Sequence, residues 1–158
     1  MKVTDALFVE HVVFHHMFDH LECAVPRLKT LAEIKALAAL MEGMLKTHSD
    51  TEDALFIGPL EHCFEQIGQR ETFHAEHQEI DRNLKLLQRA HRVKAARALL
   101  LAAVSYSRKH FDKEERIVFP LAERVLKAET LTALARNWKD QRMQVANHGE
   151  PEAALHPM

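Results

Sequence analysis

The sequence predicts an all-α protein, an antiparallel up-and-down four-helix bundle with a short extra helix and a loose tail at its C-terminal end. Only 4 Gly and 5 Pro occur among the 158 residues, and strong helix formers fill the long segments between them. Apolar residues recur at helical spacing in four of these segments, and the first two segments resemble the next two. The length suits one domain, predicted as residues 1–145, followed by a flexible tail over residues 146–158.

The first two helices are predicted from their caps and apolar rows. Thr4 is expected as the N-cap of the first helix, which ends near Pro26, and a capping box of Thr30 and Glu33 begins the second, which Gly58 and Pro59 end. The apolar row of the first helix contains one histidine: Leu7, His11, Phe14, Phe18, Leu21 and Val25. The row of the second leads to a histidine and a glutamate: Leu37, Met41, Met44, His48 and Glu52.

The next helices follow the same plan. The third is predicted to start near Gln69 and to break at residues 90–92, and the fourth covers residues 93–126. The row of the third is Phe73, His77, Ile80, Leu84 and Leu87, and that of the fourth is Leu99, Ala103, Tyr106, His110, Glu114, Ile117 and Leu121. A connection is expected at residues 60–68, and a fifth, weaker amphipathic helix at residues 130–143.

An internal repeat relates the two helix pairs. Offsets of 66 and 62 place His77 on His11 (77 − 66 = 11) and His110 on His48 (110 − 62 = 48). Residues four apart share one face of a helix, so each second helix can aim an imidazole and a carboxylate at one point. A single such pair is more often an exposed polar contact, and a single core histidine often bonds a neighbour. Two copies within apolar rows favour a metal site, because a buried carboxylate without a partner would be costly.

The predicted ligands suggest a class of metal. Four imidazoles and two carboxylates suit iron, manganese or zinc better than calcium or magnesium. Two ions bridged by Glu52 and Glu114 would keep positions open for a solvent-derived bridge and a small ligand. His15, one turn beyond His11, is a reserve candidate, whereas His16 and His20 are expected to face solvent.

Four motifs together resemble those of the hemerythrin-like, HHE cation-binding family over residues 4–126. They are Glu10-His11, His48-x-x-x-Glu52, Glu76-His77-x-x-Ile80, and His110-x-x-x-Glu114-Glu115 followed by Val118-Phe119-Pro120. The resemblance implies a non-haem di-iron centre with bridging carboxylates that handles dioxygen, nitric oxide, peroxide or iron itself.

The chain departs from oxygen-carrying hemerythrins in two places. Phe73 stands where their third helix has a further histidine, and the spacing from His110 to Glu114 is shorter than their His-x-x-x-x-Asp. His74 or His15 would replace the missing imidazole. These departures bring the chain closer to a sensor, a nitric oxide scavenger or an iron-handling protein. The predicted metal residues are therefore His11, His15, His48, Glu52, His74, His77, His110 and Glu114.

Three functions follow from this pattern. The first is a protein that binds or senses oxygen or nitric oxide at two iron ions joined by an oxo or hydroxo bridge, with manganese or zinc as other possible metals. The second is a di-iron enzyme or iron-handling protein that reduces peroxide or nitric oxide or repairs iron clusters, with electrons from a donor protein. The third is a structural or regulatory bundle with a different metal or none.

Composition and missing motifs exclude other classes. The net charge is −2 without a basic block, so nucleic acid and membrane are not expected partners. The 2 Cys among 158 residues form no zinc or iron–sulfur motif, and with no signal segment a cytoplasmic location is expected. A ferritin-like site needs Glu-x-x-His on two helices, and Glu71-x-x-His74 has no second copy. The sequence does not indicate the oligomeric state.

Overall fold

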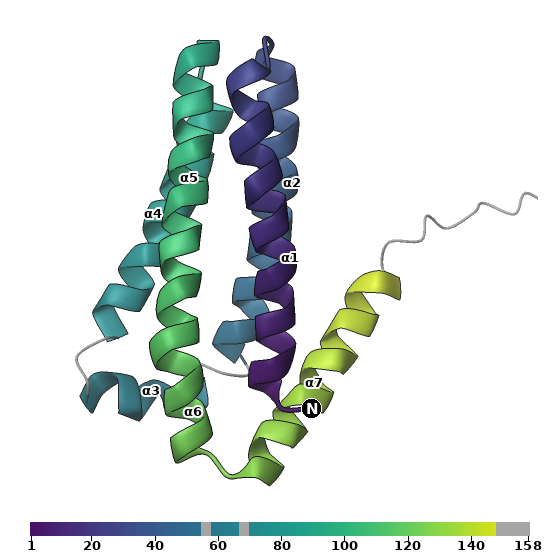
Figure 1. Cartoon of the computed structure of the whole chain (residues 1–158), viewed down its shortest axis with the longest axis vertical. Coiled ribbons are helices and arrows are strands. Elements are labelled where there is room, and N and C mark those ends of the chain that lie inside the picture. Colours follow the sequence, from purple (N-terminus) through teal and green to yellow (C-terminus); the bar gives the residue numbers. More distant parts are fainter. Residues whose placement is uncertain (55–57, 67–69, 148–158) are drawn as a thin grey trace, which may run out of the picture.

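The computed structural model describes residues 1–54, 58–66 and 70–147, with side chains over residues 1–54, 58–62 and 75–144. These residues form helices and no strand (Figure 1), which confirms the all-α class. The elements are α1 (Val3–Ala24), η1 (Val25–Arg27), α2 (Leu31–Glu52), α3 (Gly58–Gln66), α4 (Arg70–Gln88), α5 (Val93–Lys113), η3 (Glu114–Val118), α6 (Phe119–Val125) and α7 (Ala128–Asn147). None of the described helices is both long and apolar enough to cross a membrane.

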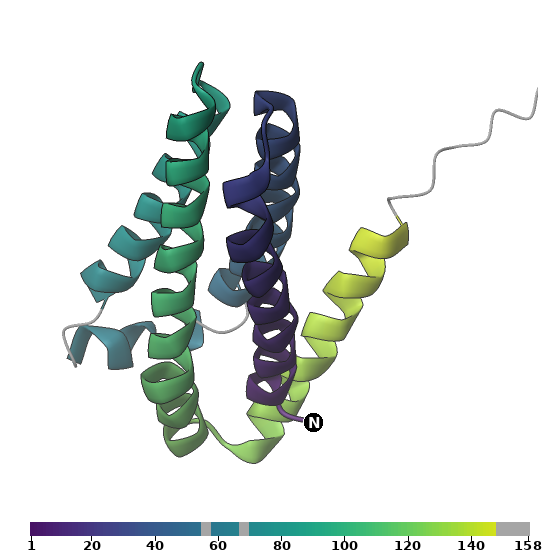
Figure 2. The ribbon, with the colours of Figure 1, turned by 45° about the horizontal axis from the view of Figure 1, so that its top comes forward.

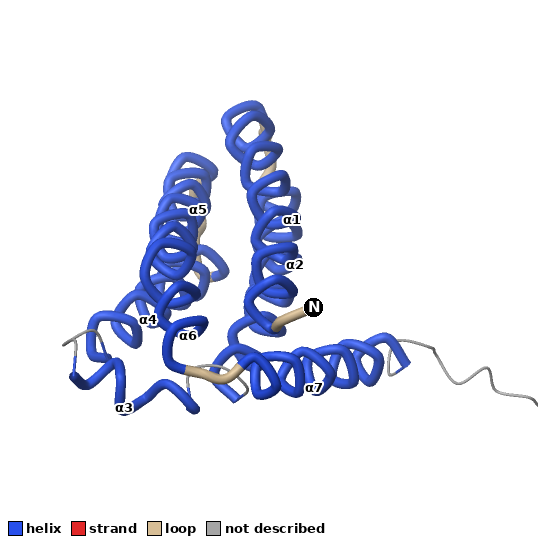
Figure 3. Tube along the Cα trace, turned by 60° about the horizontal axis from the view of Figure 1, so that its bottom comes forward, coloured by secondary structure: helices blue, strands red, loops and turns tan. Residues whose placement is uncertain are grey.

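The long helices pack as a bundle. α1 lies beside α2 and α4 beside α5, while α2 contacts both α4 and α5, and α1 contacts α5 (Figures 1 and 2). α3 lies at one end of the bundle, and α6 continues from α5 at the same end. α7 begins there, packs against α1 and then leans away from it (Figure 3).

Two apolar clusters build the interior. The larger fills the space between α1, α2, α4 and α5, with Phe18, Met41, Leu84 and Leu100 fully buried. The smaller, which contains Leu60, joins the start of α1 to α3, α6 and α7. His11 lies between Leu7 of the small cluster and Phe14 of the large one. Six of the predicted metal residues therefore form a polar layer between two apolar clusters: His11, His48, Glu52, His77, His110 and Glu114.

The predicted N-caps are correct for α2 and wrong for α1. Thr30 and Glu33 form the predicted box at the start of α2. Thr4 is not the N-cap of α1, because the helix begins at Val3 with Lys2 at the cap. Thr4 instead is buried and donates its hydroxyl hydrogen to Glu123.

The predicted apolar rows are confirmed for α1 and shifted for α2 and α5. All six residues of the α1 row are buried. Tyr106 and Ile117, in contrast, are 39% and 40% exposed, while Leu100 and Val104 are buried instead. On α2, Leu37 and Met44 are only partly buried, and the interior positions are Ile34, Ala38, Met41 and Leu45.

The ends of the predicted helices also moved. Residues 60–66 of the predicted connection, for which the sequence allowed a short turn of helix, belong to α3 (Gly58–Gln66), and the predicted fifth helix is the longer α7. α7 carries the chain as helix to Asn147, past the predicted start of the tail. Residues 148–158, including His148 and His156, lie outside the described residues, so the division of the chain at residue 145 stays a prediction.

Candidate metal centre

Six of the predicted metal residues converge at one level of the bundle. His11 comes from α1, His48 and Glu52 from α2, His77 from α4, His110 from α5, and Glu114 from the start of η3. His77 is half-buried and the other five are buried. Their ligand atoms form two overlapping groups, His11, His48, Glu52, Glu114 and Glu52, His77, His110, Glu114, and within each group all atoms lie within 4.8 Å of one another.

Glu114 contributes to both groups, because its two oxygens point at different imidazoles. Its Oε2 atom lies 3.3 Å from His11 Nε2, and its Oε1 atom lies 2.8 Å from His110 Nε2. Glu52 Oε2 lies 3.7 Å from His48 Nε2. A carboxylate whose two oxygens point at different imidazoles can bind one cation with each oxygen.

The backbone around both carboxylates is wound more widely than an α-helix. Glu114 opens η3, a π-helical turn, and Asp53 and Ala54 after Glu52 have the same conformation. Such turns occur often at functional sites. The wide turn lets two consecutive residues approach the interior, because Glu114 is buried while Glu115 is half-buried and still reaches His11.

Three carboxylates outside the groups orient three of the imidazoles. Glu10 lies 2.6 Å from His48 Nδ1, Glu76 lies 3.0 Å from His110 Nδ1, and Glu115 lies 2.9 Å from His11 Nδ1. A carboxylate accepts a hydrogen bond from a protonated nitrogen, so these contacts assign the proton to Nδ1 and leave the Nε2 lone pair for a metal.

The inward Nε2 atoms then face one another. His11 Nε2 lies 3.3 Å from His48 Nε2, and His77 Nε2 lies 2.7 Å from His110 Nε2. Two nitrogen lone pairs repel at such distances unless a proton or a metal cation lies between or beside them. The arrangement therefore favours a bound cation on each side of the layer.

The carboxylates of Glu52 and Glu114 lack the hydrogen bonds that buried oxygens normally receive, among the described residues. None of the four oxygens of Glu52 and Glu114 receives a hydrogen bond from the described part of the chain, and the nearby imidazole nitrogens approach Glu114 without hydrogen-bond geometry. Burial raises the pKa of Glu52 well above its usual range, and the charge of Glu114 adds to this. Unpartnered buried carboxylates are strongly unfavourable, and metal cations would compensate them.

The histidines compensate Glu114 in part. Burial alone would raise the pKa of Glu114, but His110 and His11 outweigh it and lower the pKa well below its usual range. In the same way, burial opposes the charged form of His110, yet Glu114 and Glu76 raise its pKa to about 9. A field that holds a proton on His110 so firmly also attracts a metal cation, which competes with that proton.

Of the two reserve histidines, His15 is not part of either group. His15 is one-third exposed; its Nε2 atom lies 3.6 Å from Glu115 and its Nδ1 atom lies 3.1 Å from Arg108. It thus lies beyond Glu115, on the solvent side. The side chain of His74 lies outside the described residues. His16 and His20 are exposed, as predicted.

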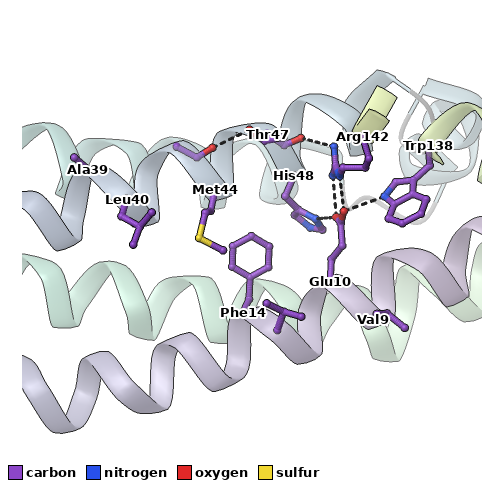
Figure 4. A pocket seen from close by; sticks show the side chains of 12 residues that line it. Val9, Glu10, Phe14, Ala39, Leu40, Met44, Thr47, His48, Trp138 and Arg142 are labelled. Carbon is purple, nitrogen blue, oxygen red and sulfur yellow. Dashed lines mark hydrogen bonds and ion pairs between the residues drawn. The ribbon is translucent and has the colours of Figure 1, made fainter. Parts of the chain in front are cut away.

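The sequence did not predict the residues that surround Glu10. Trp138 and Arg142 of α7 reach this carboxylate (Figure 4): Trp138 Nε1 donates to Oε1 at 3.0 Å, and Arg142 donates to both oxygens. Burial would raise the pKa of Glu10, but His48 and Arg142 outweigh it and lower the pKa to about 2. The motifs contained Glu10 and Glu76 beside the histidines, which was a signal for the carboxylates but not for α7.

Two cavities lead from the surface to the polar layer. One, of about 660 Å³, lies between α1, α2 and α7, is walled by apolar side chains such as Val13, Phe14 and Met44, and reaches His48. The other, of about 450 Å³, lies beside α2, α4 and α5 and reaches His77 and His110, with charged residues along it: Glu42, Lys46, Asp50, Asp53, Asp81 and Lys85.

Comparison with known proteins adds the family. A model of the hemerythrin HHE cation-binding domain matches residues 68–147, half of the chain, which includes His77, His110 and Glu114. No curated protein and no solved structure matches the chain significantly. A family defined by cation binding agrees with the buried cluster of imidazoles and carboxylates, which marks this helical protein as metal-binding. The chain therefore belongs to the hemerythrin HHE cation-binding domain family.

Proposed function

We propose that the protein holds two iron ions in the polar layer and binds or senses dioxygen or nitric oxide there. α1, α2, α4 and α5 are, in this proposal, the four helices of an antiparallel up-and-down bundle around the iron pair. The observation that carries the proposal is the position of Glu114, whose two oxygens face one imidazole of each half of the repeat. Glu52, which belongs to both groups of ligand atoms, serves as the second bridge.

The donor set fits the iron pair. His11 and His48 would hold one ion and His77 and His110 the other, and Glu52 and Glu114 would be available to both ions. Imidazole and carboxylate donors suit iron, manganese or zinc, whereas calcium and magnesium take oxygen ligands. Bound iron would supply a redox-active centre. With four protein donors for each ion, the site would keep room for a small exogenous ligand.

The surroundings of the site suit a small apolar ligand. The ring of Phe111 stacks on His11 with 4.0 Å between ring centroids, and Phe14 packs edge-on against both Phe111 and His48. These rings exclude water from one side of the polar layer. The apolar cavity that ends at His48 offers a diatomic gas a path through the same side.

A second candidate function uses the same site for turnover. The cavity that reaches His77 and His110 has charged residues along it, which suits water, peroxide or a metal ion better than an apolar gas. A di-iron enzyme or an iron-handling protein would use this path and would take electrons from a donor protein. We rank this function second because the apolar cavity has no role in it.

Metal analysis with optical spectroscopy tests the proposal. The protein as isolated, or after addition of ferrous iron, is expected to contain two irons per chain and to show near-ultraviolet bands of an oxo bridge. One zinc per chain, or no iron after reconstitution, would contradict it. A stable adduct on mixing the reduced protein with oxygen or nitric oxide supports binding or sensing, whereas rapid consumption of peroxide or nitric oxide supports the enzyme.

A further inference from the structure

The repeat makes two halves of the metal centre equivalent, but their outer carboxylates have different neighbours. Glu10 and Glu76 correspond in the repeat (76 − 66 = 10), and each accepts a hydrogen bond from the Nδ1 atom of the histidine in its own half. Lys113, from α5 inside the repeat, contacts Glu76. Glu10 is contacted by α7, which has no counterpart in the other half.

Arg142 and Trp138 fix the Glu10 carboxylate from two sides (Figure 4). Arg142 Nε donates to Oε1 at 2.6 Å and Arg142 Nη2 donates to Oε2 at 2.9 Å, which is a bidentate pair. Trp138 Nε1 adds a third donor on Oε1 at 3.0 Å. Both oxygens are therefore held, and the one that accepts from His48 cannot rotate away without breaking the bidentate pair.

The same guanidinium also ties α2 in place around His48. Arg142 Nη1 donates to the hydroxyl of Thr51 at 2.6 Å and to the carbonyl of Thr47 at 3.3 Å. These residues lie in the same stretch of α2 as His48. A single side chain of α7 thus joins the carboxylate that orients His48 to the helix that carries it.

The other half has a less rigid arrangement. A lysine ammonium is a point charge on a flexible stem, whereas a guanidinium presents a planar fork that matches a carboxylate. The Glu76 side chain is also more exposed than that of Glu10, at 26% against 17%. The lysine partner of Glu76 therefore fixes its carboxylate less rigidly than Arg142 and Trp138 fix that of Glu10.

We propose that Arg142, with Trp138, is a positioning residue of the metal centre that acts through Glu10 to fix the orientation of the His48 imidazole. As a result, the ion at His11 and His48 binds more tightly than the ion at His77 and His110. The inference rests on the proposed two-ion site. Loss of such an outer partner typically lowers metal affinity 10- to 100-fold. α7 thereby becomes part of the metal centre although it provides no ligand.

The test is a titration of the metal-free full chain with cobalt(II), whose visible absorption reports each bound ion. The chain has 1 Trp, so the fluorescence of Trp138 reports the half that contains Glu10. The wild-type protein is expected to bind two ions in two steps, with the first step changing the emission of Trp138. Arg142→Gln should weaken that step about 10-fold and leave the other within about 2-fold.

Matched variants separate positioning from general stability. Arg136→Gln removes the same charge from an exposed position of α7 and should leave both steps unchanged. Glu10→Gln should reproduce the loss seen in Arg142→Gln, and the double variant should lose no more than either single variant because both act on one contact. Glu76→Gln should weaken the other step instead.

The outcomes distinguish this inference from the proposed function. Two-step binding by Arg142→Gln at wild-type affinity, or equal weakening of both steps together with a lowered unfolding midpoint, would overturn the positioning role and leave the two-ion site standing. A wild-type chain that binds no cobalt would overturn both. If Arg142→Gln does not fold, Arg142→Lys keeps the charge without the fork, and Trp138→Phe removes only the third donor; wild-type binding by both would overturn the inference.

Discussion

The buried carboxylate of Glu52 should make the metal-free protein less stable than a neutral side chain would. Glu52 is 1% exposed, and neither of its oxygens receives a hydrogen bond from the described residues. Leaving a buried polar group unsatisfied costs about 1–3 kcal/mol, and more when it is charged. Glu52→Gln keeps the size of the side chain, removes the charge and offers an amide donor toward Glu114.

The sign of the effect follows from the pKa. Burial raises the pKa of Glu52 in the folded protein, so Glu52 ionises more readily in the unfolded chain. The folded state therefore loses stability as pH rises above the pKa of Glu52 in the unfolded chain, which is ~4.3. At pH 7 the substitution should therefore raise the free energy of unfolding of the metal-free protein by about 1–3 kcal/mol. For a chain of this size, that corresponds to a rise in Tm of roughly 2–12 °C.

Thermal and urea unfolding of chelator-treated protein measure this gain in stability, and metal analysis of the same proteins after addition of ferrous iron measures the accompanying loss of metal binding. Glu52→Gln should bind fewer ions than the wild-type protein. Asp50→Asn is the control, because it removes the same charge from an exposed position of α2 where Asp50 pairs with Lys46, a contact worth about 0–1 kcal/mol. A lower Tm for metal-free Glu52→Gln, or unchanged metal content, would refute the reasoning.

Three further predictions concern the same layer. Glu114→Ala should reduce iron to about one ion per chain or none by metal analysis, because each oxygen faces a different half; full loading would contradict the bridging role. His11→Ala should lose metal, whereas His16→Ala and His20→Ala, at exposed positions, should keep wild-type content. Glu10, with its pKa lowered from 4.5 to about 2, stabilises the fold above its unfolded pKa, and this stability should disappear as pH falls from about 5 to 2. After allowance for solvent screening the loss is about 1–2 kcal/mol, and urea unfolding of Glu10→Gln should show a flatter acid limb; an equally steep one would contradict it.

The fold was predictable where apolar residues mark one face of a helix. The α1 row holds large aliphatic and aromatic side chains at regular helical spacing, and all six of its positions are buried, although Phe8, Val9, Val12 and Val13 place further apolar side chains on an exposed face. In α5 the consecutive Leu99, Leu100 and Leu101 place apolar side chains on several faces. Periodicity cannot choose among them, so the packing of α4 and α1 against α5 decides that Leu100 is buried.

The ligand candidates were predictable because the repeat supplied two independent copies of the pattern. Spacing along helices placed His11, His48, His77 and His110 on interior faces, and the structure brings them together with both carboxylates. The π-helical turn at Glu114 was not predictable, because the apolar residues around it follow the same helical spacing as in the rest of the predicted fourth helix. Arg142 was not predictable either, because no periodic relation connects α7 to the repeat.

The two sides of the polar layer come from similar helix pairs, yet their surroundings differ because α7 packs beside only one described outer carboxylate. The two helix pairs place similar sets of imidazoles around Glu52 and Glu114, and they differ at single positions such as Lys113, which contacts Glu76 and has Thr51 as its counterpart (113 − 62 = 51). Through its described side chains Trp138 and Arg142, the additional helix α7 contacts one outer carboxylate, Glu10. Because an outer hydrogen bond acts on a metal through the histidine that it orients, a helix outside the bundle can make two otherwise equivalent metal positions chemically different.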